Sequence, residues 1–515
     1  MLATISSAVV DGIDGLCITI EVINTGTGTP RFTVVGLPDT TIRESRDRVR
    51  AALMSSGYKW PSTLPLTVNL APSDVRKHGA GLDLPLALGV LVASKQLEQA
   101  DVAGVAAVGE LGLDGSIRRV PGLVSLAEAM SHATSASGDG AELVVPLDGA
   151  SEAAIVAPGR VRGADRLRDL VEGLRGEGPL PALIEAPAVR SHDASRPELG
   201  DVRGQPLARW ALEVAAAGGH HALMVGPPGA GKTMLASRLS ALLPPLDAAD
   251  AMTVARIHSA AGLRQDGSGL DLRPPFRAPH HGMSSVALIG GGTSSIRPGE
   301  ISNAHGGVLF LDELGEFPRS VIDAMRQPLE EGVVRISRAH GAQVIPSRFQ
   351  LVAASNPCPC GNGWTDGTCR CSEAQRRTYA MRFSDPLLDR FDIRIEVSPP
   401  EPRALLGRSS EEATADVAPR VAAARQLARS RGVRSNAELT ASQLEASVPL
   451  SDAARLLLER ELLSGSLTAR GFARVWRVAR TVADLAGAPE HIQPEHVQAA
   501  LLLRIRVGAL LGAPA

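Results

Sequence analysis

The stretch Gly226-Pro227-Pro228-Gly229-Ala230-Gly231-Lys232-Thr233 decides the fold of the middle of this chain. An apolar run at 222–225 precedes it, and a segment with helical spacing at 234–243 follows it. A glycine-rich loop between a strand and a helix turns backbone N–H groups towards a phosphate, and the helix N-terminus adds partial positive charge. Lys232 would contact the β- and γ-phosphates, and the Thr233 hydroxyl would bind Mg²⁺. The loop predicts a nucleoside triphosphate site, the alternative being a glycine-rich turn that matches by chance.

Polar residues follow two further candidate strands. Residues 308–311 lead into Asp312 and Glu313, and residues 349–354 lead into Asn356. Behind a phosphate loop, Asp312 would complete the Mg²⁺ shell and Glu313 would polarise the attacking water as general base. Asn356 would sense the γ-phosphate and orient that water. The alternatives are a helix cap for the acidic pair and an ordinary Asn-Pro turn for Asn356.

The chain has 515 residues, a formal net charge of −2, 44% apolar residues and 21% charged residues. This composition is typical of a globular protein and excludes a wholly disordered chain or a histone-like basic protein. The longest apolar stretch, around 84–93, is too short to span a bilayer, and the N-terminus lacks the basic segment of a secretion signal. Five cysteines, four of them within 358–371, do not form a secreted disulfide framework. We therefore expect a cytoplasmic protein with no membrane partner.

The pattern of apolar residues predicts three domains and one linker. Residues 1–172 alternate short strand-like runs with helical spacing, which predicts an α+β domain. Residues 173–199 are rich in glycine and proline, which is typical of a linker. Residues 200–400 alternate apolar strands with helices, which predicts an α/β domain with a parallel sheet. Residues 401–515 have almost wholly helical spacing.

These motifs resemble those of a known family. The phosphate loop, the acidic pair, Asn356 and the Leu-Asp-Arg-Phe-Asp run at 388–392 look like an AAA+ ATPase core, which implies ATP as the nucleotide. Three more segments resemble the magnesium-chelatase-like YifB/ComM family: Phe276-Arg277-Ala278-Pro279-His280-His281, Arg297-Pro298-Gly299-Glu300-Ile301-Ser302 and Asn356-Pro357-Cys358-Pro359-Cys360-Gly361. The resemblance covers essentially the whole chain and implies an ATPase core with a C-terminal helical lid. It also implies that residues 1–172 have the ribosomal-S5-like fold shared with the Lon protease domain.

The resemblance assigns roles to residues outside the phosphate loop. Arg390 would be an arginine finger that reaches the γ-phosphate held by a neighbouring subunit, which implies a ring, expected to be a hexamer. Arg470 would be a second sensor arginine in the helical lid, with Arg474 and Arg477 on the same predicted helix as the alternatives. Val202 and Gly204 lie in the stretch that packs against adenine in related ATPases. The alternative for Arg390 is an ion pair with one of the aspartates of its own run.

An insertion at about 330–348 has the pattern of a β-hairpin with basic residues near its tip. These residues are Arg335, Arg338 and His340. In related ring motors such loops face the central pore, where a basic hairpin could follow a nucleic-acid backbone. Only 14 of the 515 residues are aromatic, so we expect DNA contacts at phosphates and not by stacking on bases. The alternative is a solvated hairpin without a ligand.

Four cysteines form two C-x-C pairs across a glycine-containing loop. They are Cys358, Cys360, Cys369 and Cys371. Four thiolates from two short turns can bind zinc tetrahedrally, although each pair is one residue tighter than the usual C-x₂-C. Reduced thiols, a disulfide or an iron–sulfur cluster are the alternatives. Since the cluster directly follows Asn356, a metal there would stiffen the turn beside the nucleotide.

The family resemblance implies an ATP-driven hexameric motor on DNA that performs branch migration of recombination intermediates, as in natural transformation. A first alternative is a chelatase-type motor subunit that inserts magnesium into a porphyrin with partner proteins. This chain has no acidic, metal-presenting domain of its own for that task. A second alternative is a Lon-like protease or unfoldase, which needs a serine nucleophile activated by a lysine. The comparable stretch at 77–87 contains no serine, which disfavours proteolysis.

Overall fold

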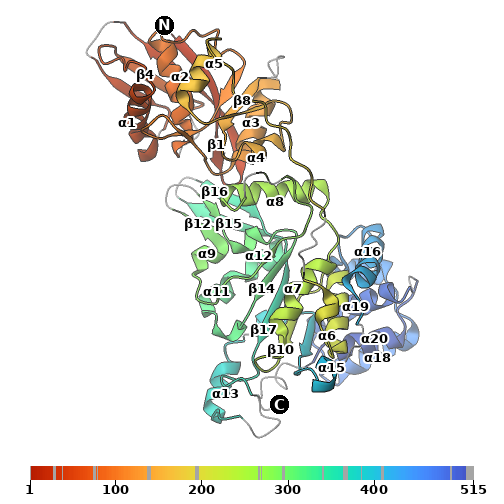
Figure 1. Ribbon diagram of the computed structural model, residues 1–515. Coiled ribbons are helices and arrows are strands. Elements are labelled where there is room, and N and C mark those ends of the chain that lie inside the picture. Colours follow the sequence, from red (N-terminus) through yellow and green to blue (C-terminus); the bar gives the residue numbers. More distant parts are fainter. Residues whose placement is uncertain are drawn as a thin grey trace.

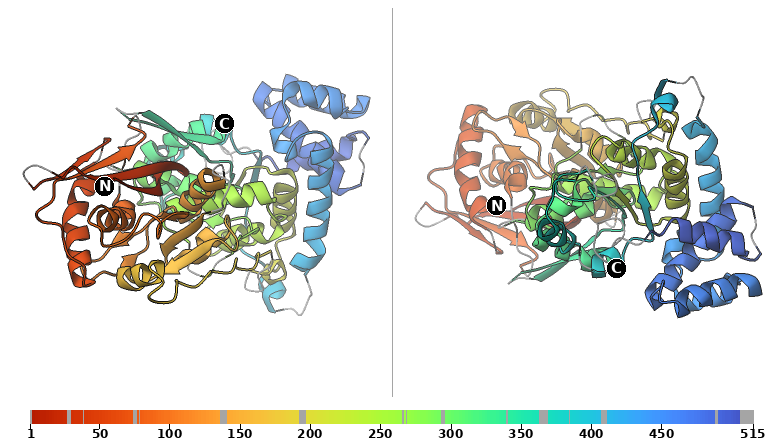
Figure 2. Two further views of the ribbon diagram at one scale, coloured as in Figure 1. Left: turned by 90° about the horizontal axis from the view of Figure 1, so that it is seen from above. Right: turned by 90° about the horizontal axis from the view of Figure 1, so that it is seen from below.

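Figure 1 shows the computed structural model of the chain, in which an N-terminal region, a central region and a helical region can be distinguished. The structure describes residues 2–26, 30–37, 39–73, 77, 79–135, 141–191, 197–264, 267, 269–292, 296–338, 341–362, 369–383, 385–406, 411–487 and 490–505. Seen along the long axis, the N-terminal region and the helical region lie on opposite sides of the central region (Figure 2). None of the helices in the described part combines the length and apolar character that crossing a bilayer requires.

The N-terminal region is built on a mixed seven-stranded sheet in the order β3-β4-β2-β1-β5-β8-β9. Its strands are β1 (Leu2–Asp11), β2 (Asp14–Asn24), β3 (Phe32–Val35), β4 (Leu66–Ala71), β5 (Val105–Ala107), β8 (Glu142–Pro146) and β9 (Val161–Ala164), and a separate short hairpin pairs β6 (Glu110–Leu111) with β7 (Ile117–Arg118). Its helices are α1 (Thr40–Ser55), α2 (Asp83–Ala93), α3 (Leu123–Ser135), α4 (Ala150–Ala154) and α5 (Leu167–Leu174). Helix α2 is apolar on nearly all sides, and every one of its residues is buried.

The central region contains a parallel five-stranded sheet in the order β11-β14-β17-β10-β18. Its strands are β10 (Ala222–Val225), β11 (Phe276–Arg277), β14 (Val308–Leu311), β17 (Gln350–Ser355) and β18 (Ile393–Glu396). The three middle strands are buried along their whole length, because helices cover both faces, and this explains their unbroken apolar sequences. The parallel sheet and the helices after it confirm the predicted α/β class.

Helices and insertions surround this sheet. The helices are α6 (Pro206–Gly218), α7 (Lys232–Leu242), α8 (Ala248–Ala260), α9 (Ser285–Ile289), α10 (Glu300–Asn303), α11 (Arg319–Ala324), α12 (Arg326–Glu331), α13 (Glu373–Ala380) and α14 (Asp385–Leu388). Two small ribbons are β12 (Gly290–Gly291) with β13 (Arg297–Pro298), and the predicted hairpin of β15 (Val333–Arg338) with β16 (Gly341–Pro346). Helix α13 projects from the end of the molecule that lies farthest from the N-terminal region (Figure 1).

The helical region packs directly on the central region. Its helices are α15 (Pro402–Leu406), α16 (Thr414–Ser430), α17 (Ala441–Ser447), α18 (Asp452–Leu463), α19 (Ala469–Leu485) and α20 (Pro494–Leu502). One hydrophobic core joins the two regions, because Val475 and Val478 of α19 belong to the same cluster as Leu212 of α6 and Met224 of β10. The helical region is therefore fixed to the sheet by burial of apolar side chains.

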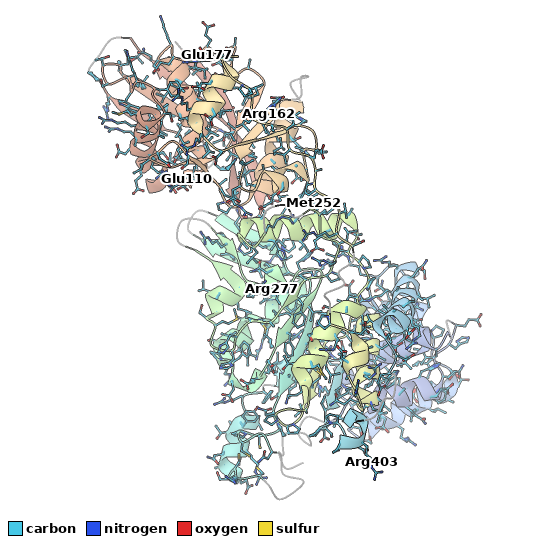
Figure 3. All side chains as sticks on the ribbon, in the orientation of Figure 1. Glu110, Arg162, Glu177, Met252, Arg277 and Arg403 are labelled. Atoms are coloured by element: carbon cyan, nitrogen blue, oxygen red, sulfur yellow. The ribbon has the colours of Figure 1, made fainter. Side chains whose placement is uncertain are left out.

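The N-terminal region is attached to α8 mainly through polar contacts. The Ser259 hydroxyl of α8 donates to the buried carboxylate of Glu152 (2.7 Å), and Arg256 forms an ion pair with Glu128 (2.6 Å). Among the residues that the structure describes, a small apolar cluster around Ile13 and Ile257 accompanies these contacts. Figure 3 shows the side chains of this junction, with Met252 labelled on α8.

Candidate functional site

The phosphate loop lies at the C-terminal edge of the central sheet, between β10 and α7. Lys232 is the first residue of α7 and is buried. Its Nζ donates to the carbonyl oxygens of Gly226 (2.6 Å) and Pro227 (2.9 Å) and to Oδ1 of Asn356 (3.1 Å). Burial lowers the pKa of Lys232, and the two acidic residues after β14 act in the opposite direction. The lysine is thus held between the loop and the strand end that bears Asn356.

Two glycines give the loop its curve. Gly229 and Gly231 have φ angles of 78° and 85°, in the left-handed region that glycine adopts without strain. Gly231 is also the N-cap of α7. The N–H of Gly226 donates to the carbonyl of Ser355 (3.1 Å), which ties the start of the loop to the end of β17. The loop therefore presents a helix N-terminus at the same edge as the ends of β14 and β17.

Asp312 and Glu313 follow β14 at this edge. Oδ2 of Asp312 accepts a hydrogen bond of 2.6 Å from the Thr233 hydroxyl, so the two predicted Mg²⁺ ligands are adjacent. Glu313 has a φ of 53°, an uncommon left-handed conformation for a residue with a side chain. Its carboxylate is half exposed and lies 3.4 Å from Nδ1 of His281. The adjacent His280 and His281 are visible in the sequence, but nothing in the sequence indicates that one of them faces Glu313.

The segment predicted to contact adenine lies beside the phosphate loop. Val202 is fully buried. The next residues reach the loop directly, because Nε2 of Gln205 donates to the carbonyl oxygens of Ala230 (2.7 Å) and Ser398 (2.9 Å). A Cβ on Gly204 would lie 2.6 Å from the side chain of Ala404, so glycine permits the close approach of α15. The segment that follows Val202 is thus hydrogen-bonded to the phosphate loop.

Arg390 lies at the opposite, N-terminal edge of the sheet, in the turn before β18. Its guanidinium forms an ion pair with Glu330 at the end of α12, and not with Asp389 or Asp392 of its own run. Burial lowers the pKa of Arg390, and nearby cations lower it further. These cations are Arg474, Arg470 and Arg326.

Asp392 is a buried anion at this edge. It accepts a hydrogen bond from Arg474 and lies 3.5 Å from Nδ1 of His220. Burial alone would raise the pKa of Asp392, but the interaction with His220 and the charge of Arg474 outweigh that effect and lower it. Arg474 therefore forms an ion pair with Asp392, whereas the ion-pair partner of Arg390 is the exposed Glu330.

The register of the sheet separates Lys232 from Arg390. Ala222 pairs with Ile393 at the N-terminal edge, and Val225 pairs with Glu396 at the C-terminal edge. Four strand residues span roughly 10 Å, and the lysine and the arginine lie beyond opposite ends of that span. Arg390 therefore cannot reach a nucleotide held by Lys232 of the same chain.

Arg470, the predicted second sensor, also lies at the N-terminal edge. It is the second residue of α19, its side chain is 69% exposed, and Nη1 lies 3.9 Å from a carboxylate oxygen of Asp389. Its charge is one of those that act on Arg390. The structure places it beside Arg390 and not beside Lys232.

The hairpin is present, and it contacts the N-terminal region. Nε2 of Gln343 on β16 donates to Asp11 at the end of β1 (2.5 Å). Arg335 is half exposed and forms an ion pair with Glu331 (2.9 Å). The side chain of Arg338 and the whole of His340 lie outside the described residues. The predicted basic tip is thus described only at Arg335.

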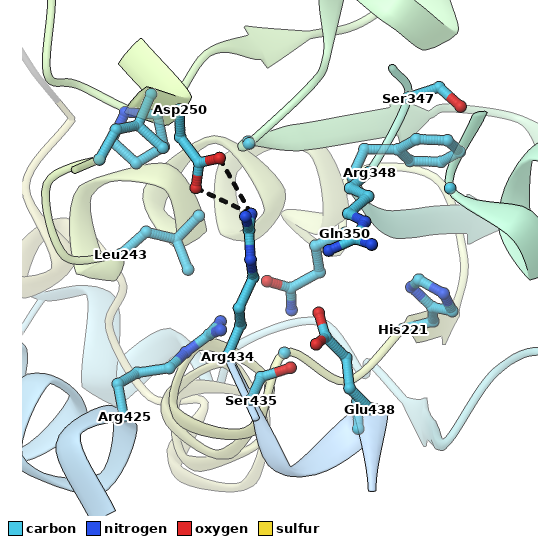
Figure 4. Close-up of a pocket in the computed structure, with 18 of the residues that line it drawn as sticks. His221, Leu243, Asp250, Ser347, Arg348, Gln350, Arg425, Arg434, Ser435 and Glu438 are labelled. Carbon is cyan, nitrogen blue, oxygen red and sulfur yellow. Dashed lines mark hydrogen bonds and ion pairs between the residues drawn. The ribbon is translucent and has the colours of Figure 1, made fainter. Parts of the chain in front are cut away.

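A cavity of about 530 Å³ opens at the N-terminal edge, between the central and helical regions (Figure 4). Arg434 crosses it to form an ion pair with Asp250 of α8 (2.8 Å). Gln350 lines it from β17, and its Nε2 is held by the carbonyl oxygens of Ala215 and His220. None of the residues predicted to bind nucleotide lines this cavity.

The four cysteines converge beyond Asn356. The Sγ atom of Cys358 lies 3.4 Å from that of Cys360 and 3.7 Å from that of Cys369, and the latter two are 3.7 Å apart. The sulfur of Cys371 accepts a hydrogen bond from the N–H of Cys360, and all four sulfurs lie within 4.8 Å of one another. No disulfide joins them, and Cys17 lies apart in β2. The cluster is a candidate metal site.

Three family models match this chain. Residues 198–405 match the model described as magnesium chelatase, subunit ChlI. Residues 20–147 match subunit ChlI of Mg-chelatase, and residues 411–504 match the C-terminal part of that subunit. This chain belongs to the magnesium chelatase subunit ChlI family. The family resemblance inferred from the motifs is thereby confirmed.

Individual relatives match this ChlI-family chain over nearly its full length. The competence protein ComM of Haemophilus influenzae is 41% identical over 99% of this chain and 98% of its own. An uncharacterized protein YifB of Escherichia coli K12 is 40% identical over 96% of this chain and 95% of its own. A YifB protein of Salmonella typhimurium is 40% identical, with 98% of this chain and 97% of its own covered. Together with the family models, these relatives support an AAA+-type motor, and the family implies ATP and Mg²⁺ as ligands.

Proposed function

We propose that this chain hydrolyses ATP as a homohexameric ring and moves on DNA, with branch migration of recombination intermediates as its task. The observation that carries the proposal is the location of Lys232 and Arg390 at opposite edges of one sheet. A phosphate loop without an arginine finger in its own chain is completed by a neighbour. A closed ring provides such a neighbour for every loop.

Hydrolysis takes place at the C-terminal edge of the sheet. Lys232 and the loop N–H groups bind the phosphates, and Thr233 and Asp312 hold Mg²⁺. Glu313 accepts the proton of the attacking water, and Asn356 orients that water. The hydrogen bonds that join Thr233 to Asp312 and Lys232 to Asn356 support this arrangement, because they bring together the side chains of each pair.

Arg390 and Arg470 of one subunit contact the γ-phosphate bound by the next subunit. Glu330 neutralises Arg390 in the single chain, and a phosphate of the neighbour takes its place in the ring. The positive charges near Arg390 support this exchange. These charges repel one another, and a phosphate placed among them would stabilise each one. A planar guanidinium suits charge that is spread over several phosphate oxygens.

DNA is the proposed substrate because of the relative named as a competence protein and because of the hairpin. Arg335, which is half exposed, and Arg338 and His340 further along the hairpin would contact phosphates without reading the sequence. A DNA substrate also implies a cytoplasmic location. We further assign zinc to Cys358, Cys360, Cys369 and Cys371 as a structural cofactor.

The description of the family models favours one competing function, that of a chelatase-type motor subunit working with partner proteins. Such a subunit would hydrolyse ATP, but its turnover would respond to a partner protein and a porphyrin and not to DNA. A Lon-like protease is less compatible with the structure. Lys77 is fully buried and donates to the carbonyl of Pro72, so its amine is not available to activate a nucleophile.

The test is the steady-state ATPase rate of the purified chain with and without single-stranded and branched DNA at low salt. Lys232→Ala serves as the blank, because it removes the only ammonium at the phosphates. We expect DNA to stimulate the rate and branched DNA to be unwound or migrated. An ATPase rate that DNA leaves unchanged would contradict a DNA motor and would favour the chelatase-type function.

A further inference from the structure

We propose that the four cysteines bind zinc as a clamp that holds the Asn356 turn against the phosphate loop, so that nucleotide affinity depends on the metal. This inference rests on the proposed function, because it assumes that the phosphate loop binds ATP. It goes further, since it makes zinc a determinant of the ATP site and not only of local folding.

The sulfur positions fit a tetrahedral ion. The Sγ–Sγ separations among Cys358, Cys360 and Cys369 are 3.4, 3.7 and 3.7 Å. In a tetrahedral site with Zn–S bonds of about 2.3 Å, neighbouring sulfurs lie about 3.8 Å apart. A disulfide would require about 2.05 Å. The Cys371 sulfur lies within 4.8 Å of these three, and four converging thiolates are the ligand set that zinc prefers in structural sites.

The clamp begins at the sensor residue itself. Cys358 follows Asn356 by two residues and is buried, so a metal bound there fixes the turn that leaves β17. Asn356 in turn accepts the hydrogen bond from Lys232. An ion held by Cys358 is therefore bound two residues along the chain from a side chain that contacts the phosphate-binding lysine.

The second half of the cluster leads into α13, which contacts the same turn. Cys371 directly precedes Ser372, which caps α13 through a reciprocal capping box with Gln375. The hydroxyl of Tyr379 on this helix donates to the carbonyl of Asn356 (3.2 Å) and lies 3.0 Å from the Ser355 hydroxyl. Joining the two cysteine pairs through one ion therefore also fixes α13 against the end of β17.

The cysteine turn also touches the phosphate loop. Gly361 has a φ of 83°, and its N–H donates to the carbonyl of Cys358 (2.9 Å). A Cβ built on Gly361 would lie only 2.6 Å from Cδ and Cγ of Pro228. The turn thus packs on the loop so closely that only glycine fits at this position. Loss of the metal would free the turn, and the loop would lose this support.

The mechanism is one of preorganisation. When a structural metal is removed, the free energy of its binding is lost from the folding of the segment that it joins. The turn at 356–361 and helix α13 would then sample more conformations, and binding of a nucleotide would have to order them again. Nucleotide affinity falls by the cost of that ordering.

The experiment measures metal and nucleotide together on the full-length chain. Zinc is counted by elemental analysis, and affinity is measured with a fluorescent ADP derivative in excess Mg²⁺. We expect one zinc per wild-type chain, and we expect Cys371→Ser to lose the zinc and bind the nucleotide at least tenfold more weakly. Cys17→Ser, a cysteine outside the cluster, should keep both properties.

A second pair of variants leaves the four ligands intact. Gly361→Ala should keep its zinc but weaken nucleotide binding, because the added Cβ pushes the turn away from Pro228. Gly432→Ala is the matched control, since its φ is 80° but no atom lies within 4 Å of the added Cβ. This pair tests the contact even if the cysteine variant fails to fold.

The outcomes separate the clamp from the nucleotide site. Lys232→Ala should retain zinc and lose the nucleotide, and a Lys232→Ala variant that binds normally would contradict the proposed function instead. Absence of zinc from the wild-type chain, or iron in its place, would overturn the assignment of the metal. Unchanged nucleotide affinity in zinc-free Cys371→Ser and in Gly361→Ala would overturn the clamp.

Discussion

The two edges of the central sheet differ in how their charges are satisfied. At the C-terminal edge, Lys232 is held by three oxygen acceptors, and Asp312 is hydrogen-bonded to Thr233. At the N-terminal edge, Arg390 is surrounded by other arginines and has only the exposed Glu330 as an ion-pair partner in the described part of the chain. One edge is a nearly complete binding site, and the other is a group of cations that an additional anion would stabilise. The comparison supports the proposal that one chain supplies two different halves of an ATPase site.

The largest effect is expected at the N-terminal edge. Arg390→Ala should lower ATP hydrolysis by about 10³-fold or more, in line with other arginine fingers, because charge that develops on the γ-phosphate loses its counterion. ATP affinity should change little, since Lys232 and the loop are untouched. Single-turnover hydrolysis and equilibrium binding measure the two effects separately.

Arg455→Ala is the control, because this arginine is exposed on α18 in the helical region. Hydrolysis that survives in Arg390→Ala would show that the cations at the N-terminal edge have no role in catalysis.

A smaller loss is expected at the C-terminal edge. Glu313→Gln removes the general base and should slow hydrolysis by about 10²-fold or more while ATP stays bound. The variant should therefore retain radiolabelled ATP after gel filtration in the presence of Mg²⁺. If it turns over ATP at the wild-type rate, Glu313 is not the base and His281 beside it becomes the group to examine.

The hairpin should contribute to DNA affinity through charge alone. The double substitution Arg335→Ala and Arg338→Ala should weaken DNA binding. The plot of log affinity against log salt concentration should also become less steep, by the amount that about two phosphate contacts contribute to its slope. Fluorescence anisotropy across a salt series measures both quantities. Arg403→Ala combined with Arg455→Ala removes the same charge from two exposed helical sites. Equal losses in the two double variants would mean that the hairpin is not a specific contact.

Acid should also destabilise the fold more through the N-terminal edge of the sheet than through the C-terminal edge. Burial lowers the pKa of both His221 and His305 to about 4, and each accepts a backbone N–H at Nδ1, from Leu351 (2.9 Å) and Arg348 (3.1 Å). Their folded-state pKa is below the unfolded value of about 6.5, so their contribution is complete above that pH and is lost as the pH falls towards 4. At pH 5, each histidine should lower the free energy of unfolding by on the order of 1–2 kcal/mol.

Urea unfolding at pH 7 and pH 5 tests this expectation. The midpoint should fall at pH 5, and His305→Asn should reduce that fall, because the amide oxygen can replace the Nδ1 acceptor without titrating. His132→Asn on the exposed face of α3 is the control. An identical fall in wild type and His305→Asn would contradict this role.

Local motifs account for most of what the sequence predicted at the C-terminal edge. The phosphate loop, Asp312, Glu313 and Asn356 each follow a buried strand, so their neighbours along the chain already determine where they lie. The parallel sheet follows from the same alternation of apolar strands and helices. The location of these residues at one edge follows from the sequence because it depends on short-range pattern, whereas their roles remain predictions.

Contacts between distant segments could not be predicted. Glu330 is the partner of Arg390 although two aspartates lie closer in sequence, and the reason is the packing of α12 beside the turn before β18. The contact of Gly361 with Pro228 and that of His281 with Glu313 arise in the same way. Such contacts depend on how insertions pack against the core, and a single sequence carries no local signal for them.

The most direct test of a shared site is to mix two inactive variants. Lys232→Ala lacks a functional phosphate loop, and Arg390→Ala lacks the finger, but a ring that contains both has some interfaces with an intact loop and an intact finger. In a random equal mixture about a quarter of the interfaces should be complete, so the ATPase rate should recover to as much as about a quarter of the wild-type rate. No recovery, in mixed rings whose assembly has been verified, would contradict the claim that the two edges of neighbouring chains form one site.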